Sequence, residues 1–209
     1  MIIVHHLENS RSQRVLWLLE ELGLEYEVKR YARNPQTMLA PPELRAVHPL
    51  GKSPVIEDDG RVVAESGAII EYLVRKYDKS HQLHPVAGSD NELDYTYWLH
   101  YAEGSLMPLL VMKLIFSRLP IEGAAKNFVD PNLDTHLAYV AGRLGEKTGF
   151  AGESLSAADI QMSFPLEAAA ARANLADKHP NLLAFLQRAQ ARPAYQRALK
   201  RGGPYELLK

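Results

Sequence analysis

The stretch Pro54-Val55-Ile56-Glu57-Asp58-Asp59-Gly60-Arg61-Val62-Val63-Ala64 decides the fold class of this chain. Two short runs rich in β-branched residues flank Asp58-Asp59-Gly60, and an Asp-Gly pair between such runs predicts a tight β-hairpin. A tight turn makes its two strands antiparallel. Pro54 stands at the start of the first run, one of the few positions where a strand accepts proline. This stretch therefore predicts an antiparallel strand pair.

The residues before the hairpin predict a strand, a helix and a second strand. The β-branched run at residues 2–4 is typical of a buried strand. Residues 10–22 place apolar side chains at helical spacing, and residues 26–31 alternate like a strand. A strand, a helix and a strand in this order predict a right-handed parallel crossover. Residues 32–53 are rich in proline and mostly irregular, with one short helix at 42–47.

The residues after the hairpin predict a second domain of a different class. A helix follows Ser66, whose hydroxyl can cap its first turn. Beyond a polar, turn-rich segment the apolar spacing is helical throughout, and no strand pattern follows residue 90. We predict an α/β domain with a mixed four-stranded sheet at residues 1–79, a linker at 80–90 and an all-helical domain at 91–209.

Two features shape the predicted helical domain. Residues 91–117 form one long helix or a broken pair, and Pro108 is the expected kink. Ser156-Ala157-Ala158-Asp159 has the Ser-x-x-Asp pattern of an amino-terminal capping box.

Composition excludes several classes of protein. The 209 residues carry 24 Lys and Arg against 25 Asp and Glu, a formal charge of −1, with 46% hydrophobic residues. A disordered chain would have fewer apolar residues and a larger charge, and a general nucleic-acid binder would be basic. We find no signal peptide and no apolar run long enough for a membrane span, so we expect a cytoplasmic protein.

The chain contains no cysteine, which excludes disulfides, thiolate metal sites and a cysteine nucleophile. Any thiol chemistry must therefore use a thiol that a ligand brings. His5 and His6 point to opposite faces of a strand, and His81 and His84 lack partners at ligand spacing, so we expect no metal site.

The turn Asn9-Ser10-Arg11-Ser12-Gln13 is the first candidate for chemistry. It precedes the first predicted helix, and a helix amino terminus stabilises anions through its free N–H groups and its dipole. A hydroxyl there can donate a hydrogen bond to a thiolate or oxyanion. Alternatively, Ser10 and Gln13 form a capping box, and the two roles can coexist.

Two further segments carry groups suited to a peptide ligand. A cis bond before Pro54 would expose the N–H and C=O of Val55 for pairing with a bound peptide, although only about 5–6% of X–Pro bonds are cis and an ordinary turn is the simpler interpretation. Glu65 and Ser66 precede a helix, where a carboxylate could hold an α-amino group and a hydroxyl an α-carboxylate. Simple capping is the alternative for this pair.

Taken together, four segments resemble the glutathione transferase family over essentially the whole chain. They are Ser10-x-Ser12-x-Arg14-Val15, Pro49-Leu50-Gly51-Lys52-Ser53-Pro54-Val55, Glu65-Ser66-Gly67-Ala68-Ile69 and Ser156-Ala157-Ala158-Asp159-Ile160. Residues 48–51, 101–105 and 162–166 are similar to the branch shared by bacteria and a yeast membrane-associated transferase. The resemblance implies a thioredoxin-like domain followed by a helical domain, a cytoplasmic homodimer and a role in detoxification.

The resemblance also implies a glutathione site and a pocket for a second substrate. Lys52 would meet the glycine carboxylate of glutathione, and Val55, after a cis Pro54, would pair with the cysteinyl backbone. Glu65 and Ser66 would hold the γ-glutamyl group. The implied glutathione-binding residues are Lys52, Ser53, Pro54, Val55, Glu65 and Ser66, and the candidate wall of the electrophile pocket is Tyr101, Ser105, Pro108 and Met112.

The activating residue departs from the best-known classes of the family. No tyrosine ends the first strand and no cysteine exists, so a serine or asparagine type remains, with Ser10 favoured over Asn9 and Ser12 also in the turn. We therefore expect a glutathione transferase whose thiolate attacks a hydrophobic electrophile, with hydroperoxide reduction left open. The alternative is a glutathione-binding regulatory or carrier protein with little activity.

Overall fold

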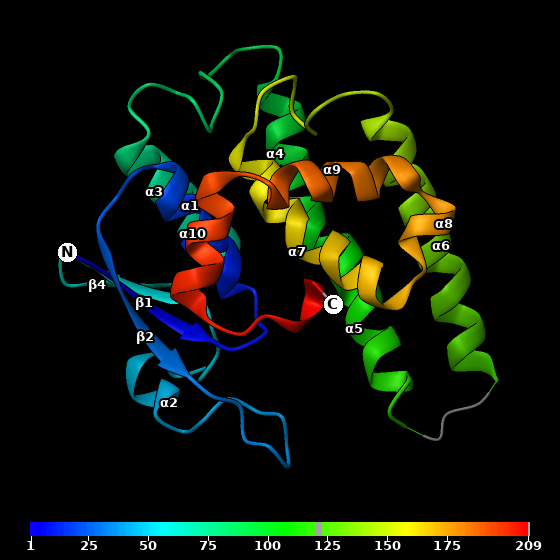
Figure 1. The fold of residues 1–209 in the computed structure, drawn as a ribbon, viewed down its shortest axis with the longest axis horizontal. Helices are drawn as coiled ribbons and strands as arrows, with labels where there is room; N and C mark the ends of the chain where they lie inside the picture. The colour runs from blue at the N-terminus through cyan, green and yellow to red at the C-terminus, as the bar shows by residue number, and fades with distance from the viewer. Residues whose placement is uncertain (120–122, 209) are drawn as a thin grey trace. The chain divides into compact units, whose positions relative to one another are not determined.

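A computed structural model describes residues 1–119 and 123–208 of the chain (Figure 1). Its contacts divide the chain into two compact units. The first unit joins Met1–His81 to Gln190–Glu206, and the second unit is built on Gln82–Ala189. The first unit thus contains both the beginning of the chain and a segment close to its end.

The first unit contains the predicted mixed sheet. Its strands are β1 (Ile2–Leu7), β2 (Tyr26–Tyr31), β3 (Val55–Asp58) and β4 (Arg61–Ala64), in the order β2-β1-β3-β4. β1 and β2 are parallel, whereas β3 is antiparallel to both β1 and β4. The parallel crossover and the Asp-Gly hairpin predicted from the sequence are both confirmed.

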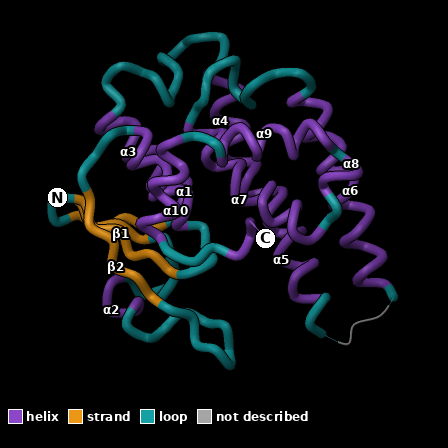
Figure 2. The backbone as a smooth tube through the Cα atoms, viewed as in Figure 1, coloured by secondary structure: helices purple, strands orange, loops and turns teal. Residues whose placement is uncertain are grey.

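Helices of the first unit lie on both faces of this sheet (Figure 2). α1 (Ser12–Glu21), α3 (Ser66–Tyr77) and α10 (Pro193–Gly202) lie on one side, and the short α2 (Leu44–Val47) lies on the other. α1 is central because its apolar residues are fully buried. These residues are Val15, Leu16, Trp17, Leu18 and Leu19.

The C-terminal helix α10 packs against α1 (Figure 1). The Tyr195 ring meets the Trp17 ring edge-on at 5.1 Å, and Arg192 lies 2.6 Å from a carboxylate oxygen of Glu21. The sequence predicts that this segment belongs to a helical domain at residues 91–209, whereas in the structure it packs with the first unit. We still propose that residues 80–90 link the α/β domain to the helical domain.

The second unit consists of helices. They are α4 (Glu92–Tyr101), a π-helical turn η1 (Ala102–Leu106), α5 (Met107–Phe116), α6 (Ala124–Leu144), α7 (Ala157–Arg172), α8 (Leu175–Lys178) and α9 (Pro180–Gln190). The break predicted at Pro108 is η1, just before it. Proline lacks the N–H that would bond four residues back and its ring clashes there, so the preceding turn widens.

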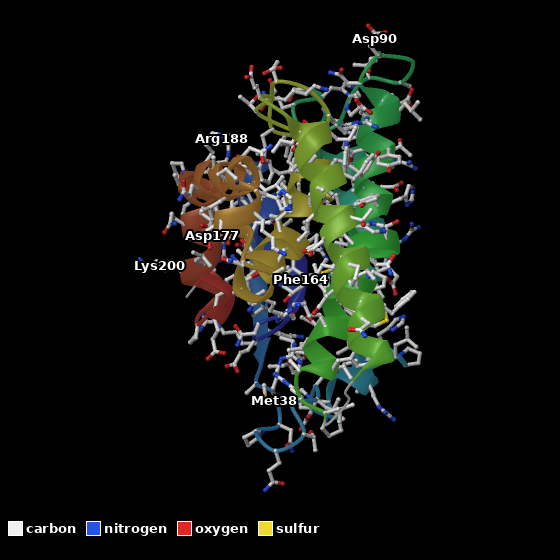
Figure 3. The ribbon with its side chains drawn as sticks, turned by 90° about the vertical axis from the view of Figure 1, so that its right-hand side faces the viewer. Met38, Asp90, Phe164, Asp177, Arg188 and Lys200 are labelled. Atoms are coloured by element: carbon white, nitrogen blue, oxygen red, sulfur yellow. The ribbon has the colours of Figure 1, made fainter. Side chains whose placement is uncertain are left out.

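α7 is the buried helix of the second unit. Ser156 accepts the Asp159 N–H, and the Asp159 carboxylate accepts the Ser156 N–H at 2.7 Å, which confirms the predicted capping box. Phe164 of α7 lies inside the unit, whereas the exposed Asp177 and Arg188 lie at its edge (Figure 3). Of the helices in residues 1–119 and 123–208, none is long and apolar enough to cross a bilayer.

Candidate functional site

The turn between β1 and α1 places Asn9 and Ser10 at the start of a buried helix. Asn9 has a left-handed backbone (φ +51°), a conformation that asparagine tolerates better than most residues. The Ser10 hydroxyl lies 2.7 Å from Ser12 Oγ and accepts the Ser12 N–H at 3.3 Å. It is almost fully buried.

The capping box that the sequence suggested for Ser10 and Gln13 is not formed. The Gln13 N–H donates to the Ser10 carbonyl at 3.2 Å rather than to the Ser10 hydroxyl. In the described residues, the side chain of Arg11 at the N-cap position makes no capping hydrogen bond, and the buried Gln13 Nε2 has no hydrogen-bond partner. The Ser10 hydroxyl instead serves the first N–H of the helix and the Ser12 hydroxyl.

The buried side chain of His6, on β1, contacts Ser12 of this turn. Ser12 Oγ is 2.8 Å from His6 Nδ1, and both side chains are buried. Burial, together with the nearby positive charge of Arg30, lowers the pKa of His6 to about 4, against a smaller opposite effect from a hydrogen bond with the Gly202 backbone. His6 is therefore neutral at neutral pH. The sequence pattern, in which His6 was considered only as a metal ligand, does not predict this contact with Ser12.

Asn9 is half-buried and tied to the C-terminal segment. Its Oδ1 accepts the Glu206 N–H at 2.7 Å, and its backbone carbonyl accepts a hydrogen bond from Arg33 at 3.2 Å. Among the residues that the structure describes, the Asn9 amide nitrogen donates no hydrogen bond. The turn thus offers an amide donor as well as a hydroxyl.

The segment before β3 carries the second group of predicted residues. The Ser53–Pro54 bond is cis, so the ordinary-turn interpretation of this segment is wrong and the geometry implied by the family resemblance is present. Ser53 Oγ donates to the His5 carbonyl at 2.8 Å and accepts the Leu7 N–H at 3.1 Å, which fixes the segment to β1. Val55 is buried at the start of β3, and Lys52 is exposed.

Glu65 and Ser66 stand at the start of α3. Glu65 is the N-cap residue, with φ +71° and ψ 119°, and its side chain is exposed. Such a backbone costs about 1–3 kcal/mol for a residue that is not glycine, and outliers of this kind cluster at functional sites. The Glu65 side chain makes no capping hydrogen bond, and Ser66 is the first helical residue of α3 rather than its N-cap.

A buried arginine connects the two helices of the site. Arg14 of α1 donates a hydrogen bond from Nη2 to Ser66 Oγ at 3.0 Å, and both side chains are buried. Sequence reasoning used Arg14 only to align the turn. Its position inside the apolar face of α1 was the available signal, because a charge there must find partners inside the protein.

The four residues proposed for the electrophile pocket lie on consecutive turns in the second unit. Tyr101 ends α4 and is buried, and its hydroxyl lies 2.6 Å from His136 Nδ1. Burial, together with the nearby Tyr97 and Tyr139, raises the pKa of the Tyr101 phenol. Ser105 and Met112 are half-buried. Pro108 is exposed in the first turn of α5.

Acidic and histidine side chains do not form a metal-binding cluster in the part of the chain described. No group of three such residues comes together there.

Comparisons with known proteins agree with one another. The family model for the glutathione S-transferase N-terminal domain matches residues 10–76, and that for the C-terminal domain matches residues 112–201. Glutathione S-transferase 3 of Schizosaccharomyces pombe is 39% identical over 93% of this chain and 85% of its own length. Glutathione S-transferase 1 of Saccharomyces cerevisiae is 37% identical over 81% of each.

A solved structure is similar over the whole length of this chain. The crystal structure of a glutathione S-transferase from Actinobacillus pleuropneumoniae has a TM-score of 0.92 at 37% identity. The match covers 100% of this chain and 96% of that one.

Proposed function

Because the chain belongs to the glutathione S-transferase family, we propose that it activates the glutathione thiol at the turn between β1 and α1. The chain is a glutathione transferase and binds glutathione. The 39% identity over 93% of its length to a transferase carries this conclusion. A carrier without transfer activity, the alternative left open by the sequence, is not favoured.

Glutathione is a γ-glutamyl-cysteinyl-glycine tripeptide, and we place its three parts along the first unit. Lys52 pairs with the glycine carboxylate, and the Val55 backbone pairs with the cysteinyl part. Glu65 binds the ammonium of the γ-glutamyl group and Ser66 its carboxylate. The exposed Glu65 carboxylate and its strained backbone support this assignment, as does the buried Arg14 that holds Ser66.

We place the thiol of glutathione at the turn between β1 and α1. The reaction needs this thiol as a thiolate, so its pKa must be lowered. A free thiol has a pKa of about 8.5, so little of it is thiolate at neutral pH. The Ser10 hydroxyl is our first candidate for the donor that stabilises the thiolate, and the Asn9 amide is the second. The start of α1 adds its dipole. Ser12 is fully buried, which supports a place behind Ser10.

The thiolate sulfur then attacks an electrophilic carbon. A carbon–sulfur bond forms, and the leaving group departs with its electron pair. No covalent bond to the enzyme is required, because holding both substrates together supplies the rate advantage of proximity. We place the apolar substrate beside Tyr101, Ser105, Pro108 and Met112. A hydroperoxide is a second electrophile class that the same thiolate could reduce.

We also propose that the enzyme is a cytoplasmic homodimer, as the family resemblance implies. Sedimentation equilibrium measures the mass in solution, and a monomer across the micromolar range would refute the dimer.

Calorimetry with glutathione, combined with ultraviolet titration of the bound thiolate, tests the proposed activation. We expect a bound-thiol pKa well below 8.5 in the wild type. Ser10→Ala should raise this pKa by about one unit, the equivalent of one lost hydrogen bond, and change affinity by a few fold at most.

Two variants make this titration decisive. An unchanged titration in Ser10→Ala with a raised pKa in Asn9→Ala would transfer the role to Asn9. Ser163→Ala is the matched control, because this buried serine donates to the Ile160 carbonyl inside α7 and should leave the titration unchanged.

A further inference from the structure

Ser10 is the outer end of a buried hydrogen-bond chain that the proposed reaction does not use. Ser10 Oγ lies 2.7 Å from Ser12 Oγ, which lies 2.8 Å from His6 Nδ1. The His6 ring lies beside Gly202 of α10. We call Ser10, Ser12, His6 and Gly202 the inward chain. Each hydroxyl has one hydrogen, so the direction of these bonds decides where the Ser10 hydrogen points.

The His6 end determines that direction. The ring is neutral and therefore carries one hydrogen. Nδ1 faces Ser12, and the Gly202 backbone raises the His6 pKa, as a carbonyl acceptor does, so we assign the single hydrogen of the ring to Nε2. Nδ1 is then an acceptor. The positive charge of Arg30 on β2 lowers the pKa of His6 and so further disfavours a second proton on the ring.

The remaining bonds follow from this tautomer. The Ser12 hydroxyl donates to His6 Nδ1, so its oxygen accepts the hydrogen of Ser10. The Leu7 carbonyl, at 3.4 Å from Ser12 Oγ, is a longer and weaker alternative acceptor. In the free enzyme the Ser10 hydrogen therefore points into the protein, away from the side where a thiolate would bind. To donate to the thiolate, Ser10 must break its 2.7 Å bond to Ser12.

We propose that Ser12 and His6 are positioning residues that restrain the Ser10 hydrogen and so keep the bound thiol less acidic than Ser10 alone would make it. This inference rests on the proposed function, in which Ser10 is the donor. It has a chemical rationale, because the nucleophilicity of a thiolate falls as its pKa falls, and the best attacking thiol has a pKa near the ambient pH. The inward chain thus balances the amount of thiolate against its reactivity.

The inference predicts an effect that loss of structure would not produce. In Ser12→Ala the Ser10 hydrogen loses its internal acceptor, so the bound-thiol pKa should fall by about 0.5–1 unit. His6→Phe should lower the pKa in the same direction by less, because the Ser12 hydrogen can then turn to Ser10 or to the Leu7 carbonyl. Ser12→Thr keeps the hydroxyl and should retain the wild-type titration.

The experiment is the ultraviolet titration of glutathione bound to each full-length variant, from pH 5 to pH 10, with affinity measured in the same samples. A merely structural role for Ser12 would weaken binding without lowering the thiol pKa. A raised or unchanged pKa in Ser12→Ala, with a raised pKa in Ser10→Ala, would overturn the inference and leave Ser10 as the donor.

The double variant Ser10→Ala/Ser12→Ala separates this inference from the proposed function. If both are right, removing Ser12 has no further effect on the thiol pKa once Ser10 is gone. If Ser10→Ala alone leaves the titration unchanged, Ser10 is not the donor and both fail. In that case Asn9→Ala should raise the thiol pKa.

Discussion

Glu65 combines a side chain suited to glutathione with a backbone that favours glycine. Its φ of +71° brings a residue with a Cβ into a region that side chains rarely occupy. Nothing in the capping of α3 requires a carboxylate here, because the helix start described in the structure is not capped by a side chain. A glutamate rather than a glycine at this φ agrees with our proposal that its carboxylate binds glutathione.

Two substitutions at Glu65 separate binding from strain. Glu65→Ala and Glu65→Gly should both weaken glutathione binding by about 10-fold or more, because each removes a hydrogen-bonded charge partner worth about 1.5–3 kcal/mol. Glu65→Gly should be more stable than Glu65→Ala by about 1 kcal/mol, since glycine adopts positive φ without strain. Calorimetry and thermal unfolding measure the two effects. Full affinity in both variants would contradict the placement of the ligand's ammonium.

Local sequence pattern predicted which segments carry candidate residues, but it did not predict the contacts that these residues make. Asn9, Ser10, Glu65 and Ser66 were candidates from local pattern, but the capping box predicted at Ser10 and Gln13 is absent. Ser10 Oγ accepts the Ser12 N–H instead, and Glu65 rather than Ser66 is the N-cap residue of α3. His6 lies beside Gly202, which is 196 residues away in the sequence, and no local pattern predicts such a neighbour.

At the scale of elements, the start of α7 is the clearest case in which a local sequence pattern was sufficient to predict the contacts that form. Both bonds of the capping box at Ser156 and Asp159 are present. The second Asp159 oxygen accepts the Phe150 N–H at 2.7 Å, which also fixes the preceding loop. Capping is local in sequence, so a four-residue motif could predict it.

Removing the Ser156 cap of α7 should lower the stability of the protein without changing the pKa of the bound glutathione thiol. Ser156→Ala should cost about 1 kcal/mol of unfolding free energy, the usual effect of losing a cap, and Ser156→Thr should cost much less. Urea unfolding at equilibrium measures the difference. Equal stability of Ser156→Ala and the wild type would show that water replaces the hydroxyl at no cost.

The junction between α4 and α5 shows why element boundaries are harder to predict than elements. The pattern at residues 91–117 predicted one long helix or a broken pair with a kink at Pro108, and the structure has two helices joined by the π-helical turn η1 just before Pro108. A kink and a π-helical turn are both responses to the same missing N–H. Which one forms depends on packing around buried residues such as Leu106 and Met107, which the helical period does not specify.

At the scale of the whole molecule, α10 determines how the chain divides. The sequence predicted an α/β class followed by helices, and both are confirmed. It did not predict that a helix near the end of the chain would pack with the first unit. The ion pairs of Arg192 with Glu21 and of Arg197 with Glu20 cross 171 and 177 residues of sequence. Amphipathic spacing identifies a helix but not its partner.

The packing of α10 should contribute strongly to stability. Tyr195 is 1% exposed against Trp17, and Tyr195→Ala should cost about 3–5 kcal/mol, as for other large buried rings. Phe128→Ala is the matched control, since Phe128 is 60% exposed and should change stability by less than about 0.5 kcal/mol. Chemical unfolding measures both. Hydrogen exchange should accelerate in β1 and α1, and an effect confined to the second unit would contradict the division of the chain.

The position of α10 has a consequence for synthesis on the ribosome. The first unit cannot complete its packing when residue 81 has been made, because its last helix begins at Pro193. The intervening Gln82–Ala189 amounts to 108 residues, which take roughly 5–20 s to translate at about 5–20 residues per second. During that interval the nascent sheet and α1 expose the surface that Tyr195 later covers. The first unit therefore begins to emerge before the second, but it completes its packing only after residues 82–189 have been made.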